Sequence, residues 1–270
     1  MATLGGHTRP DGGRAPAPVL IAALAGVIGL AWAYLLAMGW GMAHMDIGID
    51  MLIMPRMTDW GAADLALVFL MWTVMMVAMM LPTALPMVRA FWCMTRQRAA
   101  TTSVLHVGVF VAGYLVIWTG FSALVTLAQW ALLQAQRVTP MMELRDPLLA
   151  GLLLVGAGLF QLTPLKQACL RTCRSPLWFL MTAWRPGTRG AWLMGLRHGL
   201  WCTGCCWLLM ALLFVLGVMN LAWIAALTAF VLLEKTWPAH WPGARWISPA
   251  AGLVLLVWGA ALLVGALPTM

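Results

Sequence analysis

The sequence predicts an all-α fold, a polytopic bundle of membrane-spanning helices. Apolar residues make up 63% and charged residues only 9% of the 270-residue chain, whereas a soluble domain carries about 25% charged residues. Several apolar runs reach the length of about 18 residues with which a helix crosses some 30 Å of hydrocarbon. This composition excludes a soluble nucleic-acid-binding protein. The net charge of +8 is therefore expected to report orientation in a lipid bilayer.

The order of the helices is predicted from the apolar runs and from the turn residues between them. Residues 1–18 are rich in Gly, Pro and Arg and are predicted to be a disordered cytoplasmic tail. Residues 19–270 are predicted to form a single transmembrane helical domain. Its spans are expected at residues 19–40, 64–88, 104–133, 147–165, 193–217, 221–236 and 247–267. This interpretation gives about seven transmembrane helices, with six as the alternative, because only a tight turn separates the fifth span from the sixth.

The basic residues predict the orientation of these spans. With a cytoplasmic N-terminus, all of the 16 Lys and Arg residues except Arg56, Arg137 and Arg145 lie on the cytoplasmic side. Loops on that side are enriched in Lys and Arg in multi-pass membrane proteins. The chain is therefore predicted to be a multi-pass protein of a cytoplasmic membrane.

The fifth predicted span carries a pattern typical of a metal site. His198, Cys202 and Cys205 follow i, i+4, i+7 spacing and share one helix face, with Cys206 beside it. Imidazole and thiolate are ligands that soft or borderline transition metals prefer. An ionisable His in a membrane span is costly and marks a functional site by default. The alternative is that these cysteines are small apolar residues that pack closely with the glycines of the same helix.

A second cysteine pair, Cys169 and Cys173, follows Pro164, which is predicted to begin a short cytoplasmic helix. The i, i+4 spacing places both thiols on one face, next to Arg171 and Arg174, which favour the thiolate. A loop position is expected to leave this pair accessible. All six cysteines are predicted on the reducing side of the membrane, so no structural disulfide is expected. The alternative is that these two thiols have no role.

Methionine is concentrated in the first third of the chain. More than half of the 21 Met residues lie between residues 38 and 87. Met42 and Met45, with His44, form an outer cluster on the predicted extracytoplasmic side, where thioethers bind Cu(I) without forming disulfides. Met71, Met75 and Met79 form a stripe along the second span, with Met76 and Met80 beside it. The alternative is that Met fills irregular helix contacts as a flexible apolar residue.

Two further features interrupt the apolar spans. Pro82 and Pro86 are predicted to kink or break the second span, which frees carbonyl groups that must be satisfied inside the bundle. Glu234 and Lys235 lie at the end of the sixth span. They are predicted to snorkel to the lipid headgroups, with proton coupling or a pair with Arg197 as the alternative.

Three sequence blocks carry a resemblance to a known family. They are Trp72-Thr-Val-Met-Met-Val-Ala-Met-Met-Leu-Pro, Gln161-Leu-Thr-Pro-Leu-Lys, and His198-Gly-Leu-Trp-Cys-Thr-Gly-Cys-Cys-Trp with Leu233-Glu-Lys. Together they resemble an uncharacterised family of bacterial integral membrane proteins described as predicted metal-binding, over about residues 60–236. The resemblance implies a location in the bacterial inner membrane. It also implies that the five cysteines and His198 named above belong to a family pattern.

These patterns favour a membrane protein that binds and transports or delivers a soft transition metal. Copper as Cu(I) fits the Met, His and Cys ligands best, and another soft transition metal is the alternative. The outer cluster would capture the ion and the inner His and Cys residues would receive it. The chain contains no G-x-x-x-x-G-K-[ST] motif for driving export. Import, or handover to a metallochaperone or membrane metalloenzyme, is therefore expected, without enzymatic activity.

Other functions remain open at this point. One is a membrane thiol oxidoreductase that uses the cytoplasmic-side cysteines. Another is a structural subunit of a membrane metalloenzyme complex, and assembly as a homo-oligomer is compatible with each of these functions. Haem binding through His198 or His106 is a further alternative. A redox relay gives no reason for the clustered methionines, which favours metal handling.

Overall fold

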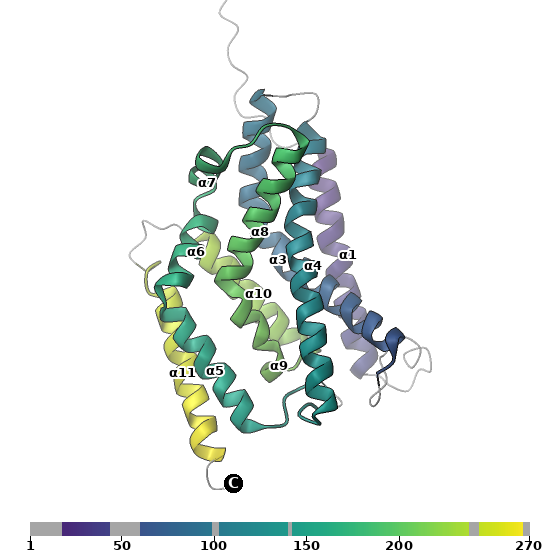
Figure 1. The fold of residues 1–270 in the computed structure, drawn as a ribbon, viewed down its shortest axis with the longest axis vertical. Helices are drawn as coiled ribbons and strands as arrows, with labels where there is room; N and C mark the ends of the chain where they lie inside the picture. The colour runs from purple at the N-terminus through teal and green to yellow at the C-terminus, as the bar shows by residue number, and fades with distance from the viewer. Residues whose placement is uncertain (1–17, 44–59, 99–102, 140–141, 238–242, 267–270) are drawn as a thin grey trace, which may run out of the picture.

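The computed structural model describes residues 18–43, 60–98, 103–139, 142–237 and 243–266, and these form a bundle of α-helices (Figure 1). Within the described residues the only β feature is a single bridge between Val138 and Leu144. The all-α prediction is therefore confirmed. The predicted tail lies outside the described residues except for Pro18, which is the first residue of α1. Proline suits this place because the first helical N–H needs no intrahelical acceptor.

The described helices are α1 (Pro18–Ala43), α3 (Ala62–Arg98), α4 (Ser103–Gln134), α5 (Pro147–Leu162), α6 (Pro164–Arg174), α7 (Pro176–Ala183), α8 (Gly187–Ala211), α9 (Leu213–Leu216), α10 (Leu221–Thr236) and α11 (Ile247–Ala266). Each predicted span corresponds to a helix or helix pair, although α3 ends ten residues later and α8 begins six residues earlier than predicted, and α7 lies in no predicted span. In length and hydropathy, α1, α3, α4, α11 and the segment Gly187–Leu216 could each cross a membrane. The pair α5 and α6, bent by 64°, adds a sixth span if the two helices form one broken span.

The predicted count of seven spans is not confirmed. The difference lies in α10, which matches the predicted sixth span but contains only 16 residues. At 1.5 Å per residue it is about 24 Å long, shorter than the roughly 30 Å of a hydrocarbon core. The structure therefore supports five or six spans among the described residues.

The helix α3 continues through Pro82 and Pro86, so the second span is not broken there, and a kink at these residues stays a prediction. Proline has no N–H, and Pro82 therefore leaves the carbonyl oxygen of Ala78 without its intrahelical donor. The indole N–H of Trp32 in α1 donates to this oxygen at 3.2 Å. A neighbouring helix thus satisfies the freed carbonyl, as expected for backbone inside a membrane bundle.

Glycines bring α4 and α8 into close contact. A Cβ on Gly195 of α8 would clash with the carbonyl oxygen of Phe110 in α4. Likewise, a Cβ on Gly113 of α4 would lie 2.6 Å from the carbonyl oxygen of Trp192. Small residues allow helix backbones to approach in this way. This contact places Tyr114 of α4 beside the cysteines of α8.

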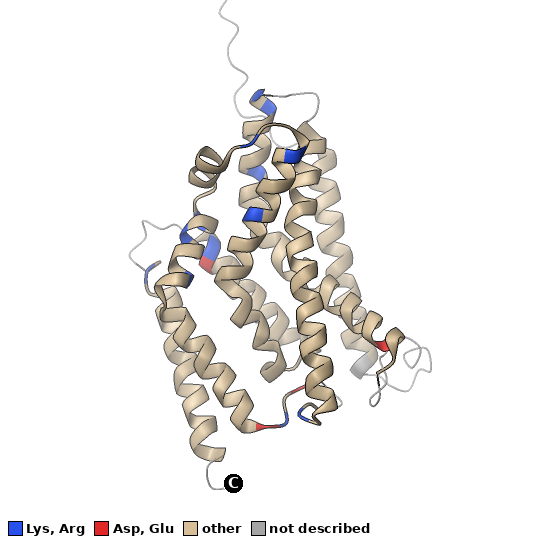
Figure 2. Cartoon of the chain, in the orientation of Figure 1, with Lys and Arg blue, Asp and Glu red and all other residues tan. Residues whose placement is uncertain are grey.

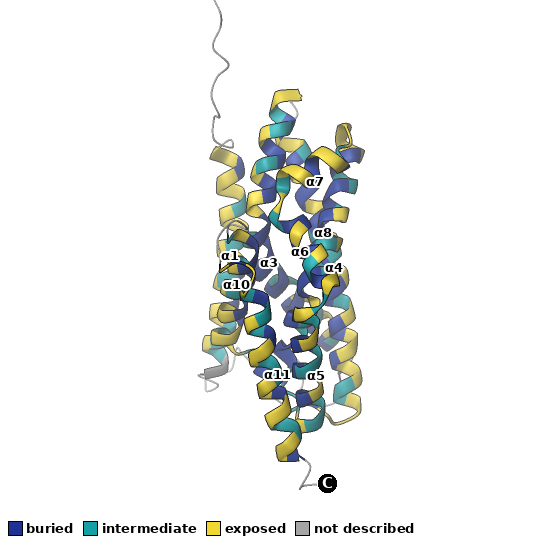
Figure 3. Ribbon diagram, turned by 90° about the vertical axis from the view of Figure 1, so that its left-hand side faces the viewer, coloured by how far each residue is buried: buried dark blue, intermediate teal, exposed yellow. Residues whose placement is uncertain are grey.

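The surface combines an apolar exterior with an asymmetric charge distribution. Figure 3 shows exposed residues along the outer faces of α1 and α11 and buried residues between the helices. Many of the exposed side chains are apolar, such as Leu124, Val254 and Val257. Figure 2 shows the described Lys and Arg residues mainly between the middle of the bundle, around α6, and the end where α3 ends at Arg98. Such a bundle is suited to lipid, and which end faces the cytoplasm stays a prediction.

Candidate metal centre

The bend between α5 and α6 brings two separate cysteine groups together. α6 begins at Pro164, and its first turn is capped by Thr163, whose hydroxyl accepts from the N–H of Lys166 at 3.3 Å. α6 then packs against α8, so that Cys169 and Cys173 belong to the same buried cluster as Cys202, Cys205 and Cys206. The loop pair and the span cysteines, which the sequence presents as distinct sets, therefore form one cluster.

The predicted accessibility of the loop pair is wrong. Cys169 and Cys173 are buried, because α6 lies against the bundle instead of in a solvent-exposed loop. The Nε of Arg174 donates to the carbonyl oxygen of Glu234 at 2.5 Å. All six cysteines are free thiols, and only Cys93 is exposed.

Cys202 lies at the centre of the cluster. The ammonium group of Lys235 in α10 donates to the Cys202 sulfur at 2.9 Å and to the Thr83 hydroxyl of α3 at 3.1 Å. The Tyr114 hydroxyl of α4 lies 3.1 Å from the same sulfur. The thiolate is the form of Cys that binds metal, and a buried anion needs a charged or hydrogen-bonding partner. Two helices, α10 and α4, supply such partners to this cysteine of α8, and Thr83 of α3 accepts a hydrogen bond from the same Lys235 ammonium group.

Glu234 and Lys235 do not snorkel, and this prediction is wrong. Their exposed fractions are 1% and 8%. Both carboxylate oxygens of Glu234 accept from the fully buried Lys166 ammonium at 2.9 Å, and the Ser248 hydroxyl donates to one of them at 2.7 Å. Lys166 also donates to the amide oxygen of Gln161. A buried acid and base can satisfy each other in this way, and the ion pair joins α6 to α10.

His198 lies inside the bundle, one turn before Cys202 on α8, with an exposed fraction of 3%. Its ring centroid is 5.4 Å from that of Tyr114, 5.7 Å from that of Phe179 and 6.0 Å from that of Phe110. Among the described residues, its buried Nδ1 has no hydrogen-bond partner. Most buried polar atoms have one, so this nitrogen is chemically available to a ligand.

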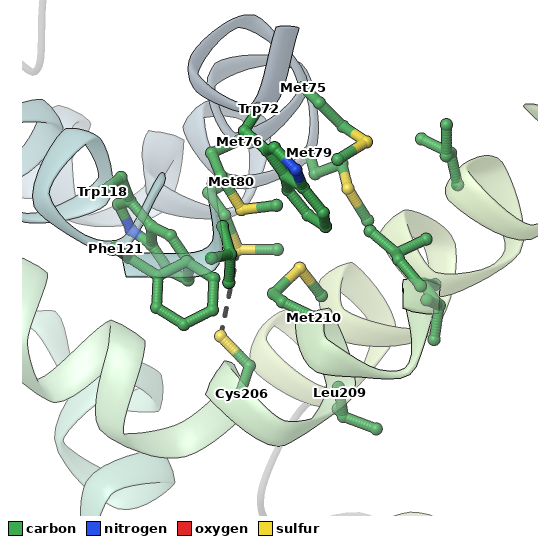
Figure 4. Close-up of a cluster of buried hydrophobic side chains, with 14 of the residues drawn as sticks. Trp72, Met75, Met76, Met79, Met80, Trp118, Phe121, Cys206, Leu209 and Met210 are labelled. Atoms are coloured by element: carbon green, nitrogen blue, oxygen red, sulfur yellow. Dashed lines mark hydrogen bonds between the residues drawn. The ribbon is translucent and has the colours of Figure 1, made fainter. Parts of the chain in front are cut away.

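The methionine stripe of α3 is buried against α8 (Figure 4). Its buried members include Met75, Met76, Met79 and Met80, which pack with Met210 of α8. The Cys206 sulfur lies 3.9 Å from the Met80 sulfur. With a metal–sulfur distance of about 2.3 Å, two ligands at a trigonal angle lie about 4 Å apart. This thiol and thioether are therefore spaced to bind one soft metal ion.

Other parts of the predicted site are outside this arrangement. His44 and Met45 of the outer cluster lie outside the described residues, and the side chain of Met42, near the end of α1, is not described. Among the side chains that the structure describes, no three of the types His, Cys, Asp and Glu are arranged to hold a metal ion. The buried sulfur atoms of the cluster are Cys thiols and the neighbouring Met thioethers.

Sequence reasoning missed several residues of the centre. Tyr114 and Thr83 contribute polar contacts that no metal-ligand pattern includes, and Lys235 was assigned to the lipid headgroups. Met80 is not among the predicted ligands, yet it is the methionine that contacts Cys206. The one available signal for Tyr114 is rarity, because the chain contains only two tyrosines.

Comparisons with known proteins associate the chain with copper. Residues 69–262 match the model of a family, PpoB2, that is described as copper chaperone. The matched segment contains every residue of the centre described above and begins after the predicted outer cluster. No protein with a curated description and no solved structure matches the chain.

Proposed function

Because the chain belongs to the PpoB2 copper chaperone family, we propose that it binds copper as Cu(I) in the buried sulfur cluster and delivers it to a partner protein. The observation that carries this proposal is the 3.9 Å separation of the Cys206 and Met80 sulfurs in the bundle interior. Thiolate and thioether ligands select soft ions such as Cu(I) over harder divalent metals. Cys202, one turn before Cys206 on α8, would complete the binding region.

The proposal places this centre within a membrane. Five described segments are long and apolar enough to span a bilayer, and the described basic residues lie mainly between the middle of the bundle and one end. By the positive-inside rule that end would face the cytoplasm, in the inner membrane of a bacterium. Copper would then be held in a low-dielectric interior that excludes competing hard cations.

Reporter fusions test this orientation. A reporter placed after Arg98 or Arg189 is expected to be cytoplasmic, and one placed after Asp146 is expected to be extracytoplasmic, because the basic loops stay on the cytoplasmic side. Paired phosphatase and fluorescent-protein fusions give opposite signals on the two sides. The reverse pattern would contradict the proposed orientation and leave the cysteines on the oxidising side.

Delivery without catalysis fits the centre better than thiol exchange. An oxidoreductase needs a thiolate that its partner can reach, and the cysteines of this cluster are buried. The expected recipient is a metallochaperone or a membrane copper enzyme. Handover then requires binding that is weak enough to reverse, which a thioether ligand such as Met80 provides better than a further thiolate.

The test of the proposed function is substitution of the thioether. Met80→Leu preserves side-chain volume, so the fold is expected to change in stability by less than about 1.5 kcal/mol. Loss of the sulfur is expected to weaken Cu(I) binding about tenfold or more, as changes around metal ligands commonly do. Affinity is measured by competition with a colorimetric Cu(I) chelator under reductant, with silver as a second soft ion.

Met71→Leu is the matched control, since Met71 is equally buried on α3. It is expected to bind Cu(I) as the wild type does. Equal Cu(I) affinity of the wild type, Met80→Leu and Met71→Leu would contradict the assignment of Met80 as a ligand. Absence of Cu(I) binding by the wild type would contradict the proposed function.

A further inference from the structure

A groove separates α1 from α3 on the outside of the bundle, and its lining contains no cysteine or methionine of the sulfur cluster. Its volume is about 1010 Å³. Most of its lining is aliphatic and includes Leu20, Leu24, Ile28, Gly29, Pro82 and Leu85. The size and composition suit a ligand with an extended hydrocarbon portion.

Two hydrogen-bond donors lie towards one end of this groove. Arg89 is exposed and has no carboxylate partner among the described residues. Trp92 is 4% exposed, and its buried indole N–H has no acceptor in the described part of the chain. From Pro82 to Trp92 the groove follows α3 for about 15 Å. Apolar lining is thus combined with a cation and an unpaired donor, with no acidic residue in the lining.

We propose that this groove binds one phospholipid molecule, with the phosphate on Arg89 and the Trp92 indole N–H and an acyl chain along α1 and α3. The guanidinium group forms strong hydrogen bonds with phosphate oxygens, and basic pockets beside membrane helices bind lipid headgroups. Arg89 lies towards the basic end of the bundle, beside the first turns of α1, which is where headgroups of one leaflet would lie. The inference rests on the membrane location proposed above and is independent of copper.

The depth of the groove offers a steric test. Gly29 lines it, and a Cβ added there would meet nothing within 4 Å. A Gly29→Leu side chain would therefore project into the space assigned to the acyl chain. Gly26 of the same helix also has open space around its Cβ but does not line the groove. Gly26→Leu is therefore a matched control for the added apolar bulk.

The experiment measures retained lipid on the full chain by native mass spectrometry in detergent, with dioleoylphosphatidylglycerol added. One lipid is expected per wild-type chain, and dioleoylglycerol, which lacks the phosphate, is expected to bind at least tenfold more weakly. Arg89→Gln should weaken binding about tenfold or more, and Trp92→Phe about threefold to tenfold, because a charged donor contributes more than a neutral one. Gly29→Leu should abolish retention. Arg96→Gln and Gly26→Leu should bind as the wild type does.

Several results would overturn the proposal. Equal retention of the two lipids, or equal loss in Arg89→Gln and Arg96→Gln, would show nonspecific association with the apolar surface. Displacement of the lipid by inorganic phosphate alone would show that the acyl chain contributes nothing. Absence of any retained lipid on the folded full chain would show that the groove has another occupant. None of these readouts involves Cu(I), so they are separate from a failure of the copper proposal.

Discussion

Cys202→Ser is expected to weaken Cu(I) binding by about 100-fold or more, the largest effect of any single substitution in the centre. Serine can still accept the hydrogen bonds that Lys235 and Tyr114 make to this position, so the surrounding helices are expected to keep their arrangement. The hydroxyl is a hard ligand, however, and does not replace a thiolate for a soft ion. Loss of a ligand exceeds the tenfold to 100-fold cost that is typical of changes around one.

Bound copper is measured on purified protein under strong reductant, together with thermal stability. The control is Cys93→Ser, because Cys93 is the exposed cysteine on α3. Cys93→Ser should bind copper normally. Normal Cu(I) affinity in Cys202→Ser, with changed disulfide content in its cellular partners, would favour the oxidoreductase alternative.

Glu234→Gln is expected to lower the free energy of unfolding by about 3–5 kcal/mol. The substitution leaves the ammonium group of Lys166, which is 0% exposed, without its anionic partner. Removing one member of a buried ion pair has this cost because the other charge stays buried and uncompensated. Loss of the ion pair is also expected to loosen α6 from α10, and with it the position of Cys173.

The double substitution Lys166→Met with Glu234→Met separates this effect from simple loss of packing. Because both charges are removed, the free energy of unfolding of the double variant is expected to return most of the way from the Glu234→Gln value to that of the wild type. Arg137→Gln provides the surface comparison, since the Arg137–Asp146 ion pair has an arginine side chain that is 54% exposed. Arg137→Gln is expected to lower the free energy of unfolding by at most about 1 kcal/mol. If Glu234→Gln is no less stable than Arg137→Gln, the buried ion pair does not hold α6 in place.

Local sequence patterns were sufficient for the helices and for the interior face of α8. The predicted range 221–236 coincides with α10, and the helices that begin at Pro147, Pro164 and Ile247 start where predicted, within a residue. These helix limits can be predicted because the apolar runs are bounded by Pro, Asn and charged residues. The helical spacing of His198, Cys202 and Cys205 likewise places all three inside the bundle.

The composition of the centre depends on tertiary structure. The bend after Leu162 carries Cys173 into the buried cluster that contains Cys202, and the close approach of α4 to α8 places Tyr114 at the Cys202 sulfur. Neither contact has a local periodicity that could predict it. Lys235 was misassigned because a charge at the end of an apolar span has the same local sequence whether it reaches lipid headgroups or pairs inside the bundle. Only the packing of α10 against α3 and α8, which buries the ammonium group beside Cys202, distinguishes the two.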